Sequence, residues 1–147
     1  MLCIGALHYL VGEHLLTLVL SFVGNTYNLV LAVLFNCAEP EAVSKALKAI
    51  HEDENLQRAL KERGVLTGAY ANRLTAVDPS WTMADSDTPQ PFRNDLDPKM
   101  YSDDFVSTWV KERGCQVVGG CCGITPEHIS YINSHLGDNY AVLDSND

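Results

Sequence analysis

The chain has 147 residues and a mass of 16.2 kDa, which is the size of one domain and enough to bury a hydrophobic core. Its 46% hydrophobic and 20% charged residues exclude an intrinsically disordered protein. Nineteen acidic against ten basic residues give a net charge of -9, which repels phosphate backbones and argues against a nucleic-acid-binding protein.

The N-terminal part of the chain is apolar and has no lysine or arginine before Lys45. A secretory signal peptide needs a basic region before its apolar stretch, so we expect a cytoplasmic protein with reduced cysteines. The stretch from Leu15 to Phe35 carries no charge, but polar residues at 25–28 interrupt it and no basic flank orients it. We therefore favour two apolar elements joined by a polar turn over a membrane helix.

Apolar runs and helix signals then alternate along the chain. The apolar runs predict three strands, at 29–35, 65–70 and 115–118. Capping residues and prolines predict four helical stretches, which begin near Pro40, Glu54, Ser102 and Pro126. Ser102 is expected to be an N-cap, and Ile129, Ile132 and Leu136 are expected to face inward from the last helix. His128 and His135 lack the spacing of a metal-binding pair and are expected to be surface or packing residues.

The alternation of strands and helices calls for a parallel sheet with right-handed crossovers. In such folds the carboxyl ends of the strands share one face, and this face carries the active site. Cys37 follows the first predicted strand, Asn72 the second, and Cys121 and Cys122 the third. Cysteines from distant parts of the sequence are therefore expected to converge.

Three converging cysteines suit a zinc ion that performs chemistry. Such an ion usually has three protein ligands and an open fourth position, and Cys37, Cys121 and Cys122 would supply a soft thiolate set. Gly119 and Gly120 let the backbone bend tightly before the adjacent pair. A negative ligand set keeps a bound substrate sulfur electron-rich, which favours sulfur alkylation. Buried thiols without a metal, or thiol redox chemistry at the pair, are the alternatives.

These motifs resemble the homocysteine S-methyltransferase family. The resemblance is carried by Val118-Gly-Gly-Cys-Cys-Gly-Ile-Thr-Pro-Glu-His-Ile129 and by Asn36-Cys37-Ala-Glu-Pro-Glu-Ala-Val43. It implies a zinc-dependent (β/α)8 barrel that transfers a methyl group from a donor to the thiol of homocysteine and so forms methionine. It also implies that Cys37, Cys121 and Cys122 hold the metal, and that Asn72 contributes to substrate binding.

The length of the chain limits how much of a barrel it can form. A whole barrel needs about 250 residues, so the resemblance implies a partial TIM barrel of roughly the last three βα units. The expected divisions are an apolar N-terminal segment outside the family resemblance at 1–28, the C-terminal part of the barrel at 29–137 and an acidic tail at 138–147. The alternative function is an inactive zinc-binding fragment that associates with another chain, because a partial barrel leaves sheet edges open. If the other chain is a second copy, the result is a homo-oligomer.

Overall fold

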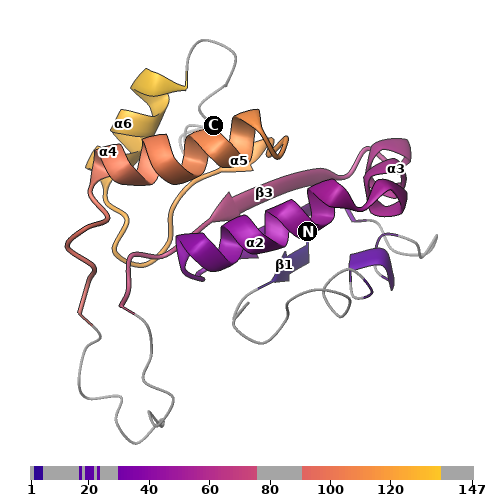
Figure 1. The fold of residues 1–147 in the computed structure, drawn as a ribbon, viewed down its shortest axis with the longest axis horizontal. Helices are drawn as coiled ribbons and strands as arrows, with labels where there is room; N and C mark the ends of the chain where they lie inside the picture. The colour runs from indigo at the N-terminus through magenta and orange to yellow at the C-terminus, as the bar shows by residue number, and fades with distance from the viewer. Residues whose placement is uncertain are drawn as a thin grey trace, which may run out of the picture.

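A computed structural model of the chain describes residues 30–75 and 91–136, residues 17, 19–21 and 23, and the backbone of 2–4. It contains a parallel sheet in the order β1-β2-β3-β4 (Figure 1). The strands are β1 (Leu2–Ile4), β2 (Ala32–Asn36), β3 (Leu66–Tyr70) and β4 (Val117–Val118). All three neighbouring pairs are parallel, which confirms the predicted α/β class.

The strand β1 lies in the N-terminal segment, where the sequence predicts no strand. It pairs with β2 through Leu2 opposite Val33 and Ile4 opposite Phe35. The described residues therefore contribute four strands to the sheet, one more than predicted. These strands form an open sheet, so the described residues show the parallel α/β arrangement, and the expected partial TIM barrel stays a prediction.

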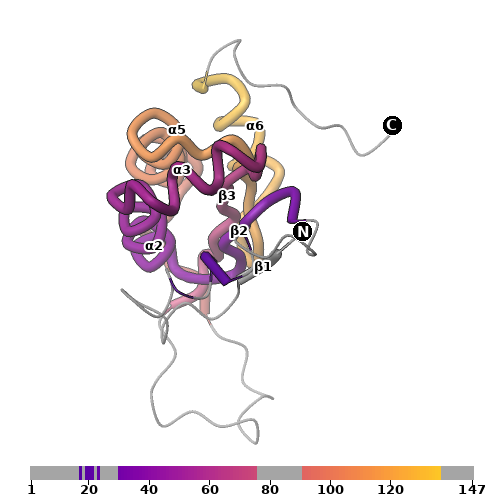
Figure 2. Tube along the Cα trace, turned by 90° about the vertical axis from the view of Figure 1, so that its right-hand side faces the viewer, coloured from indigo at the N-terminus to yellow at the C-terminus, as the bar shows by residue number. Residues whose placement is uncertain are grey.

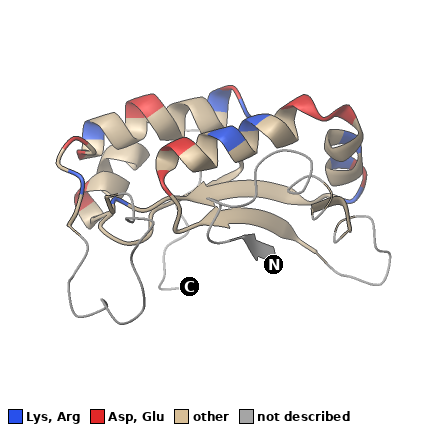
Figure 3. Cartoon of the chain, turned by 60° about the horizontal axis from the view of Figure 1, so that its bottom comes forward, with Lys and Arg blue, Asp and Glu red and all other residues tan. Residues whose placement is uncertain are grey.

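The helices cover one face of this sheet (Figures 2 and 3). They are α2 (Pro40–Glu52), α3 (Glu54–Glu62), α4 (Pro98–Met100), the π-helical η3 (Tyr101–Val106), α5 (Ser107–Lys111) and α6 (Pro126–His135). The segments α4, η3 and α5 follow one another directly and form a single helical run. Lysine, arginine and acidic residues lie on the helices and loops, whereas β2, β3 and β4 carry none, as Figure 3 shows.

The main hydrophobic core lies between the sheet and the helices. Val33 and Phe35 alternate along β2 and are fully buried in this core, while Leu47 and Ile50 join it from α2. Trp109 of α5 is also fully buried. Its indole N–H donates a hydrogen bond of 2.7 Å to the Ser44 hydroxyl. This bond satisfies the polar atom of Trp109 and ties α5 to α2.

Part of the uncharged stretch from Leu15 to Phe35 lies outside the described residues. Of the residues that are described, Val19 and Val23 are fully buried and belong to the main core. Nowhere in the described part of the chain does a helix have the length and apolar composition needed to span a membrane. The predicted acidic tail at 138–147 lies outside the described residues as well.

The third helical stretch begins earlier than predicted, and the prediction of Ser102 as its N-cap was wrong. Asp97 is the N-cap, because its carboxylate accepts a hydrogen bond of 2.8 Å from the backbone N–H of Met100. Pro98 occupies the first turn, where its fixed φ suits a helix and its missing N–H has no partner to lose. Ser102 is buried one turn further along.

The first turn of α6 is held by His128. The backbone N–H of Thr125 donates to His128 Nδ1 at 3.2 Å, and His128 Nε2 lies 3.2 Å from the carbonyl oxygen of Leu96. Because Nδ1 is the acceptor, the ring proton is on Nε2 and is donated to Leu96. His128 thus takes a buried position, and the prediction that Ile129 faces inward was wrong, since its side chain is 40% exposed.

Replacement of His128 by alanine is expected to lower the free energy of unfolding by about 2–3 kcal/mol. The variant leaves a cavity and removes the partners of Thr125 and Leu96. His135→Ala is the matched control, because His135 is exposed at the other end of α6 and its loss is expected to cost no more than about 0.5 kcal/mol. Urea unfolding measures both changes. Equal losses in the two variants would contradict the role assigned to His128.

Candidate metal centre

Loops that follow β2 and β3 meet at the carboxyl edge of the sheet. Cys37 follows β2 directly, and its backbone N–H donates to the carbonyl oxygen of Tyr70, at the end of β3, at 3.0 Å. The backbone N–H of Asn72 donates in return to the carbonyl oxygen of Ala38 at 2.9 Å. These two bonds extend the pairing of β2 and β3 into the loops and fix where Cys37 lies.

The loop that follows β4 is joined to the loop after β3 in the same manner. Gly119 N–H donates to the Ala69 carbonyl at 3.0 Å, and Cys121 N–H donates to the Ala71 carbonyl at 2.9 Å. The Tyr101 hydroxyl donates to the Gly119 carbonyl at 2.7 Å and accepts from Ala71 N–H at 3.3 Å. Burial raises the pKa of Tyr101, which therefore keeps the proton that this bridge requires.

The three cysteines that the sequence singles out lie together at this edge. Cys37 Sγ is 3.6 Å from Cys122 Sγ, and Cys121 Sγ is 3.8 Å from Cys122 Sγ. All three sulfurs lie within 4.8 Å of one another. A tetrahedral zinc ion with bonds of about 2.3 Å to sulfur separates its sulfur ligands by about 3.8 Å. The three sulfurs are therefore close enough to bind one metal ion, and the spacings of Cys37 and Cys121 from Cys122 match those of zinc ligands.

The pKa values of Cys37 and Cys121 are shifted in opposite directions. Burial raises the pKa of Cys37, but the hydrogen bonds from Cys121, Cys122 and Asn72 outweigh it and hold this pKa below its ordinary value. Burial and the bond to Cys37 raise the pKa of Cys121 to about 12. The Cys37 thiol therefore loses its proton more readily than the Cys121 thiol. A soft divalent cation would replace these protons, because it binds the deprotonated form.

Exposure differs among the three cysteines. Cys122 is exposed, whereas Cys37 and Cys121 are half-buried. A metal ion held by the three would therefore be reachable from the side of Cys122. Cys115 is buried away from the cluster, and its burial raises the pKa of the thiol to about 12. This agrees with the expectation that Cys115 packs as a small hydrophobic residue.

The sequence of the chain matches the model of a known protein family. The model for homocysteine S-methyltransferase matches residues 3–136. The chain belongs to the homocysteine S-methyltransferase family. The resemblance seen in the cysteine motifs is thereby confirmed. Neither a curated protein sequence nor a solved structure gives a significant match.

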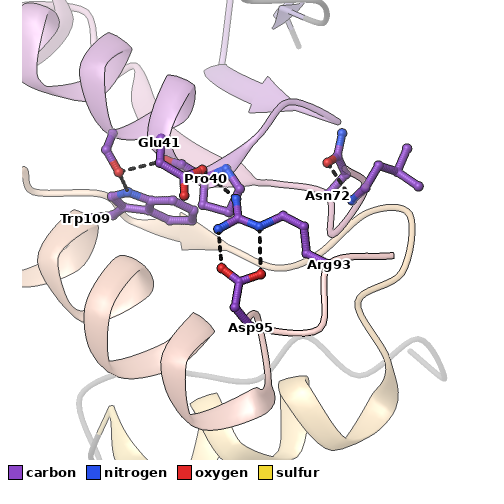
Figure 4. Close-up of polar contacts among 8 residues, drawn as sticks. Pro40, Glu41, Asn72, Arg93, Asp95 and Trp109 are labelled. Atoms are coloured by element: carbon purple, nitrogen blue, oxygen red, sulfur yellow. Dashed lines mark hydrogen bonds and ion pairs between the residues drawn. The ribbon is translucent and has the colours of Figure 1, made fainter. Parts of the chain in front are cut away.

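In this homocysteine S-methyltransferase family member, Asn72 lies between the cysteine loops. Its side-chain Nδ2 donates to the carbonyl oxygen of Cys37 at 2.9 Å. Its Oδ1 accepts from Leu74 N–H at 3.1 Å (Figure 4). The residue is 7% exposed. The oxygen and the nitrogen of the carboxamide are both engaged within the protein. Substrate binding by Asn72, implied by the resemblance, stays a prediction.

Arg93 forms a polar cluster that the sequence gave no reason to expect. Its guanidinium contacts Glu41 Oε2 at 2.8 Å and Asp95 Oδ2 at 2.8 Å, and Figure 4 shows it between the two carboxylates. The backbone N–H of Arg93 donates to the Arg73 carbonyl, and Arg73 N–H donates to the Cys122 carbonyl. Arg93 therefore links the start of α2 to the loop that carries Cys122. Glu41 and Arg93 are 52 positions apart, so no local pattern could reveal the pair.

Arg93→Met is expected to make the stability of the protein less sensitive to acid. Burial raises the pKa of Glu41, but the hydrogen bond from Arg93 outweighs it, and the same guanidinium lowers the pKa of Asp95. Carboxyl groups with a depressed folded-state pKa stabilise the protein above their unfolded pKa, and this stability is lost as the pH falls through the folded value. The difference in unfolding free energy between wild type and variant should therefore be largest at neutral pH and shrink below about pH 4.

Urea unfolding of both proteins between neutral and acidic pH measures this difference. Lys99→Met is the control, because Lys99 pairs with Asp103 within one exposed helical turn at 2.6 Å. Such surface pairs contribute little, so the control should follow the wild type at each pH. A difference between wild type and Arg93→Met that stays constant over the whole pH range would contradict the assignment.

Proposed function

We propose that this chain catalyses the zinc-dependent transfer of a methyl group to the thiol of homocysteine, giving methionine. Cys37, Cys121 and Cys122 would hold the zinc ion. The observation that carries the proposal is the convergence of three sulfurs, from loops after two different strands, at 3.6 and 3.8 Å. Membership of the family supports the reaction class. A soft set of three thiolates favours zinc over harder cations.

The three cysteines determine the character of the site. They would hold a zinc ion, which would act there as a Lewis acid and favour the thiolate form of a substrate thiol. The negative charge of three thiolates keeps a neighbouring sulfur electron-rich, so that it remains a nucleophile. The exposed side at Cys122 is where we expect the substrate and the methyl donor to approach.

The overall reaction is a substitution at the methyl carbon. The substrate sulfur forms a bond to this carbon, and the bond between the carbon and the donor breaks, with its electron pair remaining on the donor. The proton of the substrate thiol is released to solvent. No oxidant or reductant is needed.

We propose that β2, β3 and β4 are strands of the C-terminal part of a (β/α)8 barrel at residues 29–137. Support comes from the position of the cysteines, since the active sites of such barrels lie at the carboxyl ends of the strands. A location in the cytoplasm, where thiols stay reduced, fits a centre of three free cysteines.

A methyl-transfer assay tests the proposed function. The purified chain is incubated with homocysteine and, in separate reactions, a methyl sulfonium compound, betaine or a methyl folate. Methionine should form with at least one donor, disappear after removal of the metal by a chelator, and return when zinc but not magnesium is added. Methyl transfer that continues undiminished after complete removal of zinc would contradict the proposal.

A second candidate is a zinc-binding chain without activity of its own, which associates with another chain. The observation in its favour is the open edge of the sheet, because among the described strands β4 pairs with β3 alone. Bound zinc together with no methionine from any donor would favour this candidate. Size-exclusion chromatography that shows a stable, folded monomer would count against it.

A further inference from the structure

Cys37 has a backbone conformation that its residue type does not favour. Its φ is 49°, in the left-handed region, where a side chain with a Cβ atom is strained. Such conformations cost about 1–3 kcal/mol and persist only where the surroundings impose them. The Cys37 N–H is held by the Tyr70 carbonyl at 3.0 Å, and the Cys37 carbonyl is held by Asn72 Nδ2 at 2.9 Å. Of these two bonds, only the second involves a side chain.

The carboxamide of Asn72 is itself held in place. Its Oδ1 accepts from Leu74 N–H at 3.1 Å, and the backbone N–H of Asn72 donates to Ala38 at 2.9 Å. The Nδ2 atom of Asn72, which donates to the Cys37 carbonyl, also lies 4.0 Å from Cys37 Sγ. The side chain at position 72 must therefore donate to the carbonyl of Cys37, in the loop after β2, and accept from the N–H of Leu74, in the loop after β3. A carboxylate lacks the donor, and an aliphatic side chain lacks both.

We propose that Asn72 is a positioning residue that holds Cys37 in the left-handed conformation from which its sulfur reaches Cys122. Asn72 thereby sets the affinity of the cluster for its metal without contacting the substrate. The inference rests on the proposed zinc site and deepens it, because it assigns to Asn72 a role different from the substrate binding implied by the resemblance. Partners that orient a metal ligand change metal affinity by about 10–100-fold when they are replaced.

Asn72→Asp tests the inference, because the two side chains have nearly the same shape. The carboxylate can still accept from Leu74 N–H, but it cannot donate to the Cys37 carbonyl. Zinc affinity, measured by competition with a chromophoric chelator, is expected to fall at least about tenfold. The KM for homocysteine at saturating zinc is expected to stay within about twofold, since Asn72 acts through Cys37. Asn72→Ala, which introduces no charge, is the second variant if Asn72→Asp does not fold.

Ser44→Ala is the matched control for a general loss of stability. It removes the hydrogen bond from Trp109 inside the core and touches none of the cysteine loops. Its zinc affinity is expected to equal that of the wild type. Unchanged zinc affinity in the Asn72 variants would overturn the inference. A raised KM for homocysteine in the same variants would then assign Asn72 to the substrate.

A measurement on the metal-free chain separates this inference from the proposed function. Amide hydrogen exchange by NMR reports on Leu74 N–H, which Asn72 binds directly, and on Cys37 N–H. Asn72→Ala is expected to speed exchange at both amides by at least about tenfold relative to Ser44→Ala. Unchanged exchange at both would overturn the inference. If the wild type binds no zinc, the proposed function fails, and this measurement still decides whether Asn72 holds the loop of Cys37.

Discussion

Replacing Cys37 by alanine is expected to reduce the zinc content of the purified protein from about one ion per chain to below about a tenth of that. The variant leaves two adjacent cysteines from a single loop, which cannot enclose an ion from opposite sides. Methyl transfer is expected to be lost with the metal. Zinc content is measured by inductively coupled plasma mass spectrometry, and the sulfur signal of the protein gives the stoichiometry.

Cys115→Ala is the matched control for this variant. It also removes one thiol, but Cys115 is buried away from the cluster and has an elevated pKa. Its zinc content is expected to match that of the wild type, even though loss of the buried sulfur lowers stability by about 1 kcal/mol. Equal zinc contents in the two variants would mean that Cys37 is not a ligand.

Gly68→Ala is expected to destabilise the protein by about 2–3 kcal/mol or more. A Cβ atom at this position would overlap the carbonyl oxygen of Val117 and lie 2.7 Å from Cδ2 of Leu34. The Val117 oxygen belongs to the backbone of β4, so relief of the overlap requires β4 to move away from β3. Since β4 leads directly into Cys121 and Cys122, we expect zinc affinity to fall together with stability. Urea unfolding and chelator competition measure the two effects.

Gly119→Ala is the control for Gly68→Ala. A Cβ atom at Gly119 would meet Tyr70 Cβ at 3.6 Å, which is an ordinary contact. The residue does not have a positive φ, so alanine is expected to be neutral or to stabilise the chain slightly by restricting the unfolded state. A similar loss of stability in both glycine variants would show that the close approach at Gly68 is not what limits the sheet.

The site could be predicted from the sequence to the extent that it depends on topology. Apolar runs before Cys37 and before Cys121 predict parallel strands, and parallel strands bring their carboxyl ends to one edge. The convergence of these cysteines therefore needed no tertiary detail. The strand β1 was missed because three apolar residues in a long apolar segment carry no distinguishing pattern.

Other features depend on contacts that a local pattern does not encode. Asp97 and Ser102 are both suitable N-cap residues, and only the proline at 98 could have favoured the first of them. His128 takes the position in a capping box that is usually filled by glutamate or glutamine, so the sequence did not reveal it. The left-handed backbone of Cys37 is accompanied by a bond to Asn72, 35 positions away. Long-range hydrogen bonds of this kind appear only once the chain is folded.

X-ray absorption spectroscopy at the zinc edge, on the zinc-loaded wild-type chain, tests the central claim most directly. The claim is that sulfurs from the loops after β2 and β4 jointly bind one zinc ion. We expect one zinc ion per chain with three sulfur neighbours at about 2.3 Å and one lighter neighbour. Addition of homocysteine is expected to raise the number of sulfur neighbours to about four. A zinc ion surrounded by nitrogen and oxygen alone, or a chain that binds no zinc, would contradict the account.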